Sequence, residues 1–332
     1  MIAQSYNSTP AKPGAYLPRL DEALRNLETN RRARAATPLK PEAIVLPTWP
    51  NWPDICRAVP NGFLRSALFG AIGRGRRRYI NGEDISSIEG VYIRYKGERL
   101  DQGDLDVWES ILQSVRVQEV GRQCRLTSYS LLKMIGKKDT GGNRLTLQNR
   151  IERFVASALT IKQGRYTYIG GLIRFAAKDE ETQEWVIGLD EKLRPLFAAD
   201  QFTLIDWSIR QKLDGKPLAQ WLHGFYSSHA QPFAMKIETL LKLSGTENEN
   251  PRSANQKLKK GLAAVSEASK GSLIFSFRGD LVKVTKRVKK MVRINSYTVT
   301  ADAEYRHSGC TIHRPNRPET RTSAGFQVKE KL

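Results

Sequence analysis

Two segments of this chain are rich in the side chains that can read base pairs. Arginine and lysine donate hydrogen bonds to guanine, and asparagine and glutamine form paired hydrogen bonds with adenine. The first segment carries Arg144, Thr146, Gln148, Asn149, Arg150 and Arg153. The second carries Arg252, Ser253, Asn255, Gln256, Lys257, Lys259 and Lys260, and a strand-like run after it adds Lys283, Lys286 and Arg287. Either these are two base-contacting surfaces, or they are ordinary solvated helix faces.

Apolar residues recur at helical spacing within both segments. Leu147, Ile151 and Phe154 share one face of the first, with Val155 and Ala158 continuing it, and Leu258, Leu262 and Val265 share one face of the second. Spacings of three and four residues predict amphipathic helices with the polar side chains outward. We expect Thr146 to cap the first of them.

The elements before and after these helices repeat as well. The run Leu131-Leu132-Lys133-Met134-Ile135-Gly136 is echoed by Leu240-Leu241-Lys242-Leu243-Ser244-Gly245, and each copy leads through a polar loop into one basic helix. Strand-like residues follow at 165–175 and 272–285. A repeated helix, turn, helix and β-wing predicts an α+β chain with two tandem winged-helix domains, a fold that places a helix in a DNA groove.

Composition shifts set the expected domain limits. We expect a flexible N-terminal extension over 1–48, with a short helix inside 21–36, and a basic, flexible C-terminal tail over 291–332, because few bulky apolar residues occur there. The first winged-helix domain should span 49–190 and the second 191–290. Within the first we expect a strand over 88–95, a turn at 96–98, and a helix over 104–117 capped by Asp101 or Asp104. Trp108, Trp207 and Trp221 should lie in apolar cores.

The charge balance favours a polyanionic partner. The formal net charge is +20, and a cluster of arginines between the expected elements is suited to holding phosphates or to forming a solvated loop, namely Arg74, Arg76, Arg77 and Arg78. No apolar run of about 18 residues predicts a membrane span, and no secretory signal is evident. The sequence therefore predicts a cytoplasmic protein without a membrane partner.

Catalytic and metal-binding patterns are weak. The three cysteines are scattered, and His307, Cys310 and His313 lack a fourth zinc ligand nearby. Gly73-Arg74-Gly75 does not match a phosphate-binding loop, and His223 and His229 are six residues apart, which is wrong for one helix face. We therefore expect no enzymatic activity, no cofactor and no metal.

Several sequence blocks resemble plasmid replication initiators of the TrfA type. They run in order from Trp52 to Lys286 and are densest in Trp52-Pro53-Asp54 with Arg57, Pro60-Asn61, Arg65-Ser66-Ala67-Leu68-Phe69, Tyr226-Ser227-Ser228-His229 and Lys236-Ile237-Glu238-Thr239-Leu240. The resemblance implies two winged-helix domains that bind direct repeats, called iterons, in duplex origin DNA of a bacterial plasmid. It further implies opening of the adjacent AT-rich duplex, recruitment of the host helicase with the host initiator, and a homodimeric storage form.

The sequence departs from that family pattern at one place. The family's best-known members carry a Gln-x-x-Leu-Phe type motif for the sliding clamp before the first domain, where this chain has Ile44-Val45-Leu46-Pro47-Thr48-Trp49. This argues against clamp binding by the segment. Two other functions remain open from the residues alone: a winged-helix transcriptional repressor, and a nicking enzyme that starts rolling-circle replication.

Overall fold

The computed structural model describes residues 52–73, 75, 77–118, 123–248 and 250–287, together with Glu22, Arg25, Asn26, Glu28, Thr29 and Pro50. Two compact units are distinguished, Met1–Pro47 and Thr48–Leu332. In the first unit the described residues are helical and fall inside the helix expected over 21–36. The expected tail over 291–332, the other residues of the expected extension, and Arg74 and Arg76 lie outside the described residues.

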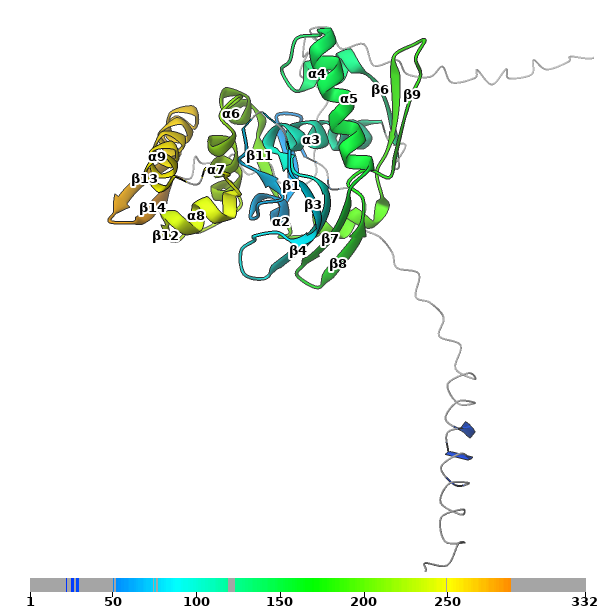
Figure 1. The fold of residues 1–332 in the computed structure, drawn as a ribbon, viewed down its shortest axis with the longest axis horizontal. Coiled ribbons are helices and arrows are strands. Elements are labelled where there is room, and N and C mark those ends of the chain that lie inside the picture. Colours follow the sequence, from blue (N-terminus) through cyan, green and yellow to red (C-terminus); the bar gives the residue numbers. More distant parts are fainter. Residues whose placement is uncertain are drawn as a thin grey trace, which may run out of the picture. The chain divides into compact units, whose positions relative to one another are not determined.

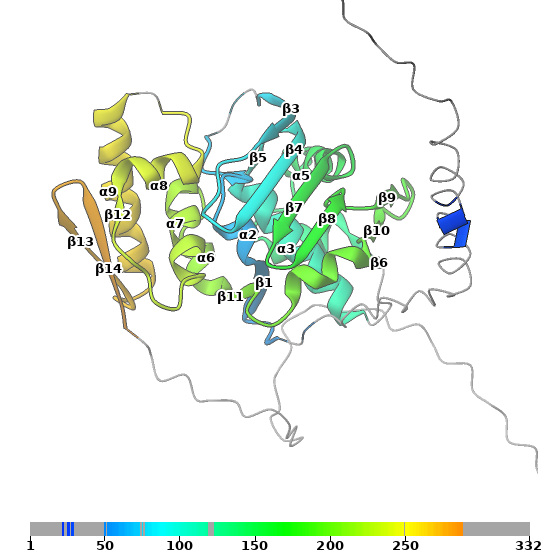
Figure 2. The ribbon, with the colours of Figure 1, turned by 90° about the horizontal axis from the view of Figure 1, so that it is seen from below.

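A four-stranded antiparallel sheet forms one layer of the second unit (Figures 1 and 2). Its order is β3-β4-β7-β8, from β3 (Tyr79–Asp84), β4 (Val91–Glu98), β7 (Ala158–Gln163) and β8 (Tyr166–Gly170). Ile93 and Tyr95 point into the core while Tyr92, Arg94 and Lys96 alternate outward. The strand expected over 88–95 therefore begins later, and the turn expected at 96–98 is wrong, because β4 stays paired with β3 as far as Glu98.

A second group of elements contains the first copy of the repeated sequence. It comprises α3 (Gln102–Val117), β6 (Gln123–Thr127), α4 (Ser128–Met134), α5 (Gly141–Val155), β9 (Phe175–Lys178) and β10 (Glu184–Gly188), with the sheet order β6-β10-β9. The helix expected over 104–117 is confirmed, and Asp101 and Asp104 form a reciprocal capping box at its start. The strand-like run expected at 165–175 does not form the hairpin of this group. The strands β7 and β8 belong to the four-stranded sheet, and β9 and β10 form the hairpin that pairs with β6.

The same order of elements recurs in the second repeat. It comprises α7 (Pro217–Ser227), β12 (Met235–Lys236), α8 (Ile237–Ser244), α9 (Pro251–Ala268), β13 (Leu273–Arg278) and β14 (Leu281–Lys286), which are grouped together in Figure 1. Its sheet order is β12-β14-β13. In both sheets the strand before the helix pair therefore lies beside the last strand of the hairpin. The repetition in sequence is thus a repetition of topology.

Short elements complete the first core. The strand β1 (Cys56–Pro60) pairs with β11 (Phe202–Asp206), and β2 (Phe69–Gly70) pairs with β5 (Leu100–Asp101). The helices α2 (Asn61–Leu64) and η1 (Glu191–Phe197) lie between these strands in sequence, and α6 (Trp207–Lys212) follows β11. Leu193, Phe197 and Ile205 belong to the first hydrophobic core. Apart from Ala71, the buried residues of the second core all lie from Leu213 onward. The two cores thus divide after Ile205, beyond the limit expected at 190–191.

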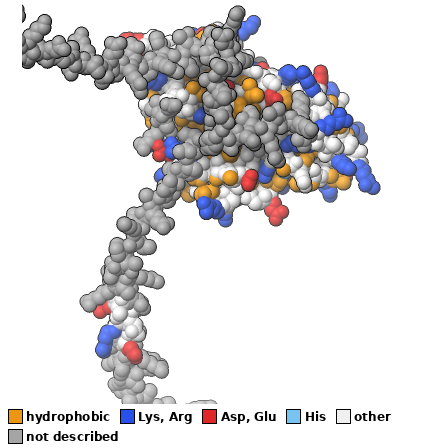
Figure 3. Space-filling view, turned by 180° about the vertical axis from the view of Figure 1, so that it is seen from behind, with side chains coloured by type: hydrophobic (Ala, Val, Ile, Leu, Met, Phe, Trp, Pro, Cys, Tyr) orange, Lys and Arg blue, Asp and Glu red, His pale blue; other side chains and the backbone are white. Residues whose placement is uncertain are grey.

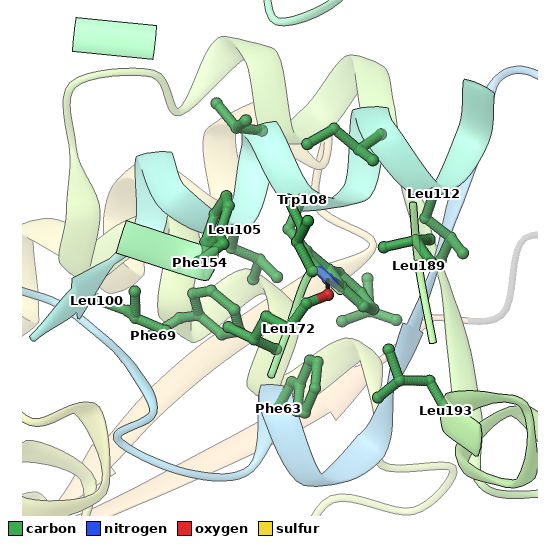
Figure 4. Close-up of a cluster of buried hydrophobic side chains, with 14 of the residues drawn as sticks. Phe63, Phe69, Leu100, Leu105, Trp108, Leu112, Phe154, Leu172, Leu189 and Leu193 are labelled. Atoms are coloured by element: carbon green, nitrogen blue, oxygen red, sulfur yellow. Dashed lines mark hydrogen bonds between the residues drawn. The ribbon is translucent and has the colours of Figure 1, made fainter. Parts of the chain in front are cut away.

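Aromatic and leucine side chains pack together in the first core (Figure 4). Trp108 is fully buried, and its ring centroid lies 5.2 Å from that of Phe63. Its indole N–H donates a hydrogen bond to the carbonyl oxygen of Leu172 at 3.1 Å. Trp207 and Trp221 are also buried, so the expectation for all three tryptophans is confirmed. Truncating such a side chain to alanine removes about 3–5 kcal/mol of stability.

Polar side chains join the two cores. Arg210 of α6 is fully buried and donates to Asp106 of α3 at 2.5 Å and to the carbonyl oxygen of Gln102 at 3.0 Å. The indole of Trp221 donates to the carbonyl oxygen of Ser66 at 2.9 Å. Buried charges are tolerated only when paired, so these contacts fix the first core against α6 and α7.

Candidate nucleic-acid interface

The helix α5 buries one side and leaves the other open. Leu147, Ile151 and Phe154 are buried as expected, whereas Val155 is exposed and Ala158 belongs to β7. The helix begins five residues before Thr146, and Thr140 caps it by accepting a hydrogen bond from the amide of Asn143 at 3.2 Å. The cap expected at Thr146 is therefore wrong: its hydroxyl donates within the helix to the carbonyl oxygen of Gly142 at 2.8 Å.

The open side of α5 forms a continuous ridge, which we call the α5 ridge. It consists of residues three and four apart, namely Gly141, Gly142, Leu145, Gln148, Asn149 and Glu152. Asn149 is exposed, while Gln148 is half-buried and donates to Glu152 at 2.9 Å. Leu145, at the centre of the ridge, is 59% exposed. Sequence reasoning missed Leu145 and the two glycines, although their helical spacing from Asn149 was available as a signal.

Two arginines expected on this surface face the protein instead. Arg150 and Arg153 donate to the same carboxylate oxygen of Asp104, at 2.9 Å and 2.7 Å, and Arg150 also reaches Asp101 at 2.8 Å. Their side chains are 17% and 8% exposed. This corrects the expectation that both side chains face outward. The charge-assisted hydrogen bonds to the buried carboxylate of Asp104 hold the two guanidinium groups against the protein.

Arg77 joins the same cluster from the other side. It ion-pairs with Asp101 and donates to Asp104 at 3.2 Å, so it is corrected from a phosphate contact to a structural residue. Although burial opposes ionisation, Arg150 and Arg77 hold the pKa of Asp101 below its usual value. Burial, with Asp101 nearby, raises the pKa of Asp104 to about 6, so both groups are carboxylates at neutral pH. Arg78 pairs with Glu83 on the surface.

Carboxylates also offset the remaining charge around α5. Arg144 is exposed but forms two hydrogen bonds to Asp139, at 2.6 Å and 2.7 Å. Glu152 lies on the ridge itself, and the tip of the β9–β10 hairpin contains Asp179, Glu180 and Glu181. On α5 itself the arginines are therefore paired with carboxylates, while Lys133 and Lys138 are exposed before the helix.

The helix α9 has a different electrostatic character. Asn250 caps it by accepting hydrogen bonds from the amides of Arg252 and Ser253, at 3.0 Å and 3.2 Å. Leu258, Leu262 and Val265 are buried as expected. The polar residues expected outward are exposed or half-buried, namely Arg252, Ser253, Asn255, Gln256, Lys257, Lys259 and Lys260. Figure 3 shows Lys and Arg side chains gathered where α9 and the β13–β14 hairpin lie.

The β13–β14 hairpin and the residue after it leave the expected cationic side chains exposed. These are Lys283, Lys286 and Arg287. Lys286 donates to the carbonyl oxygens of Ser227 and His229, both at 3.1 Å, and burial lowers its pKa. Lys286 thus anchors the C-terminal end of α7, and its expected contact with DNA stays a prediction.

In the described part of the chain, no group of three or more His, Cys, Asp or Glu side chains is arranged for a metal ion. His223 is buried, and burial lowers its pKa to about 4. Among the described residues, no helix combines the length and apolar character needed to span a membrane.

Comparison with known proteins places these features in a family. The profile of the TrfA protein family matches residues 37–285. The plasmid replication initiator protein TrfA of Escherichia coli is 28% identical over 205 residues, which cover 59% of this chain and 53% of that protein. The chain therefore spans about half the length of this curated relative.

Two solved structures show weaker likeness. A crystal structure of domains 2 and 3 of RctB covers 68% of this chain and 97% of its own, with a TM-score of 0.46 and 16% identity. The Pi initiator protein in complex with iteron DNA covers 55% of this chain and 92% of its own, with a TM-score of 0.38 and 12% identity.

Proposed function

The chain belongs to the TrfA family, and we propose that it is a plasmid replication initiator that binds direct repeats in duplex origin DNA. In this proposal the groups α3 to β10 and α7 to β14 are two winged-helix modules, and α5 and α9 are their recognition helices. The repeated topology and the matching sheet orders support this interpretation. Residues 1–48 and 291–332 are extensions of these modules.

One observation carries the proposal. The outer face of α9 presents Arg252, Gln256, Lys257, Lys259 and Lys260 together, while the opposite face is buried in the second core. Lysine and arginine hold phosphates and read guanine, and glutamine reads adenine. A helix with one face fixed and the other basic is suited to the major groove.

Further steps follow from the family and are part of the proposal. The bound protein opens the adjacent AT-rich duplex and recruits the host helicase together with the host initiator, without enzymatic activity of its own. A homodimer serves as storage form, and the protein acts in the bacterial cytoplasm. The relative named a plasmid replication initiator supports this assignment.

Origin DNA tests the proposal directly. The full chain is incubated with supercoiled plasmid carrying the repeats, and permanganate detects unpaired thymines beside them. Melting next to occupied repeats supports an initiator, and occupied repeats without melting under any condition favour a transcriptional repressor. Adding Mg²⁺ and searching for a nick or a covalent adduct distinguishes a rolling-circle enzyme, and either product would contradict the proposal.

A further inference from the structure

An exposed leucine occupies the centre of the α5 ridge. Leu145 is 59% exposed on a helix whose other large apolar residues before Val155 are all buried. It lies one turn after Gly141 and Gly142 and one turn before Asn149, so these four residues share a face. Leu145 thus lies between two glycines without side chains and the amide side chain of Asn149. Such a face can contact a partner surface that has both apolar and polar groups.

The two glycines have no structural reason to be glycine. A Cβ atom at Gly141 or Gly142 would meet nothing within 4 Å, and neither residue has a positive φ. Glycine is unfavourable in helices because it loses more backbone entropy than other residues. The absence of side chains here leaves room for another molecule to approach the backbone of α5 closely, next to Leu145.

Electrostatics restricts what this surface can use for recognition. Asp139 neutralises Arg144, Glu152 is on the ridge, and Arg150 and Arg153 face Asp104. The arginines of α5 are therefore engaged by carboxylates, which leaves the other exposed side chains of the helix to contact base edges. In the major groove the 5-methyl group of thymine is the apolar feature that a leucine can contact, and Asn149 can read adenine.

We infer that Leu145 contacts the 5-methyl group of a thymine in the origin repeat and is a specificity-determining residue of the first module. The inference rests on the proposed function, since it requires α5 to enter the groove of the repeat. It adds base recognition by α5 to the phosphate and base contacts proposed for α9.

Thymine-to-uracil replacement tests the contact at a single methyl group. The full chain is titrated with duplexes carrying one repeat, in which each thymine in turn is replaced by deoxyuridine. For the unaltered protein we expect one or two positions at which uracil weakens binding roughly 3- to 10-fold. Leu145→Ala should bind the thymine duplex with a similar loss and show no further loss with uracil at those positions.

A matched control removes another exposed apolar side chain from the same helix. Val155 is 42% exposed in the last turn, and Val155→Ala should retain the full sensitivity to uracil. Equal sensitivity of the unaltered protein and Leu145→Ala at every thymine overturns the inference. A change in oligomeric state of Leu145→Ala without any change in DNA binding also overturns it, because the surface then serves a protein partner.

The outcomes separate this inference from the proposed function. If the unaltered protein and Leu145→Ala both prefer the repeat to unrelated DNA and lose the same affinity at every uracil position, the inference fails while origin binding stands. If the unaltered protein shows no preference for the repeat, the proposed function itself fails. Unchanged thermal unfolding of Leu145→Ala is expected, because the side chain is exposed.

Discussion

Asp104, in the first turn of α3, accepts a hydrogen bond from Arg153 of α5 at 2.7 Å, and its own side chain has no exposed surface. Arg150 and Arg77 bind the same carboxylate. The proposed recognition helix is therefore held to the first core by charge as well as by its apolar stripe. This arrangement uses three arginines that would otherwise add to the DNA-binding charge.

Replacing Asp104 should destabilise the first core. Asp104→Asn leaves three guanidinium groups with less negative charge in a buried site, and removal of one partner from a buried ion pair typically lowers stability by about 3–5 kcal/mol. Chemical denaturation of the full chain measures the change. Asp139→Asn is the control, because the pair with Arg144 is exposed and should have no measurable effect. Equal stability of Asp104→Asn and the unaltered protein would contradict the structural role of the cluster.

The two lysines at the centre of α9 should contribute to DNA affinity through phosphates. Lys259→Ala/Lys260→Ala is expected to weaken binding and to reduce the slope of log affinity against log salt by about 2. Fluorescence anisotropy at several salt concentrations measures both quantities. Lys192→Ala/Lys212→Ala removes the same charge from exposed positions outside α9 and should leave the slope nearly unchanged. A similar slope for both double variants would remove α9 from the interface.

The threonine at the start of α5 should matter more than the one inside it. Thr140→Ala removes the cap on the Asn143 amide and is expected to lower stability by about 1 kcal/mol. Thr146→Ala removes only a bond from an exposed hydroxyl to a helix carbonyl, and helix propensity favours alanine. Thermal unfolding of the two variants side by side tests where the helix begins, and the reverse order of stability would place its start at Thr146.

Burial of Glu109 should make stability depend on pH. Burial raises its pKa to about 7, above the unfolded value of about 4.3. The folded protein thus retains a proton that the unfolded chain releases, so this contribution to stability is complete below about pH 4 and is lost as the pH rises through about 7. In Glu109→Gln the free energy of unfolding should depend less on pH between pH 4.5 and 7 than in the unaltered protein. An unchanged pH profile in this variant would show that Glu109 does not titrate in that range.

Local patterns determined much of this protein from its sequence. The stripes Leu147-Ile151-Phe154 and Leu258-Leu262-Val265 identified both helices and their buried sides, because side chains three and four residues apart necessarily share a helix face. The cap at Asp101 and the stop at Gly136, whose φ is +69°, follow from equally local chemistry. The repeated run before each helix indicated the repeated topology.

Only the tertiary structure decided which charges and strands meet. Arg150 and Arg153 follow Asp104 by more than forty residues, and nothing in their spacing distinguishes them from the exposed Asn149. The hairpin β7–β8 joined β4 rather than β10, and β1 paired with β11, which lies at the other end of the first core in sequence. The physical reason is that a helix period depends on neighbours along the chain. An ion pair or a strand partner depends on which distant surface burial brings within hydrogen-bonding distance.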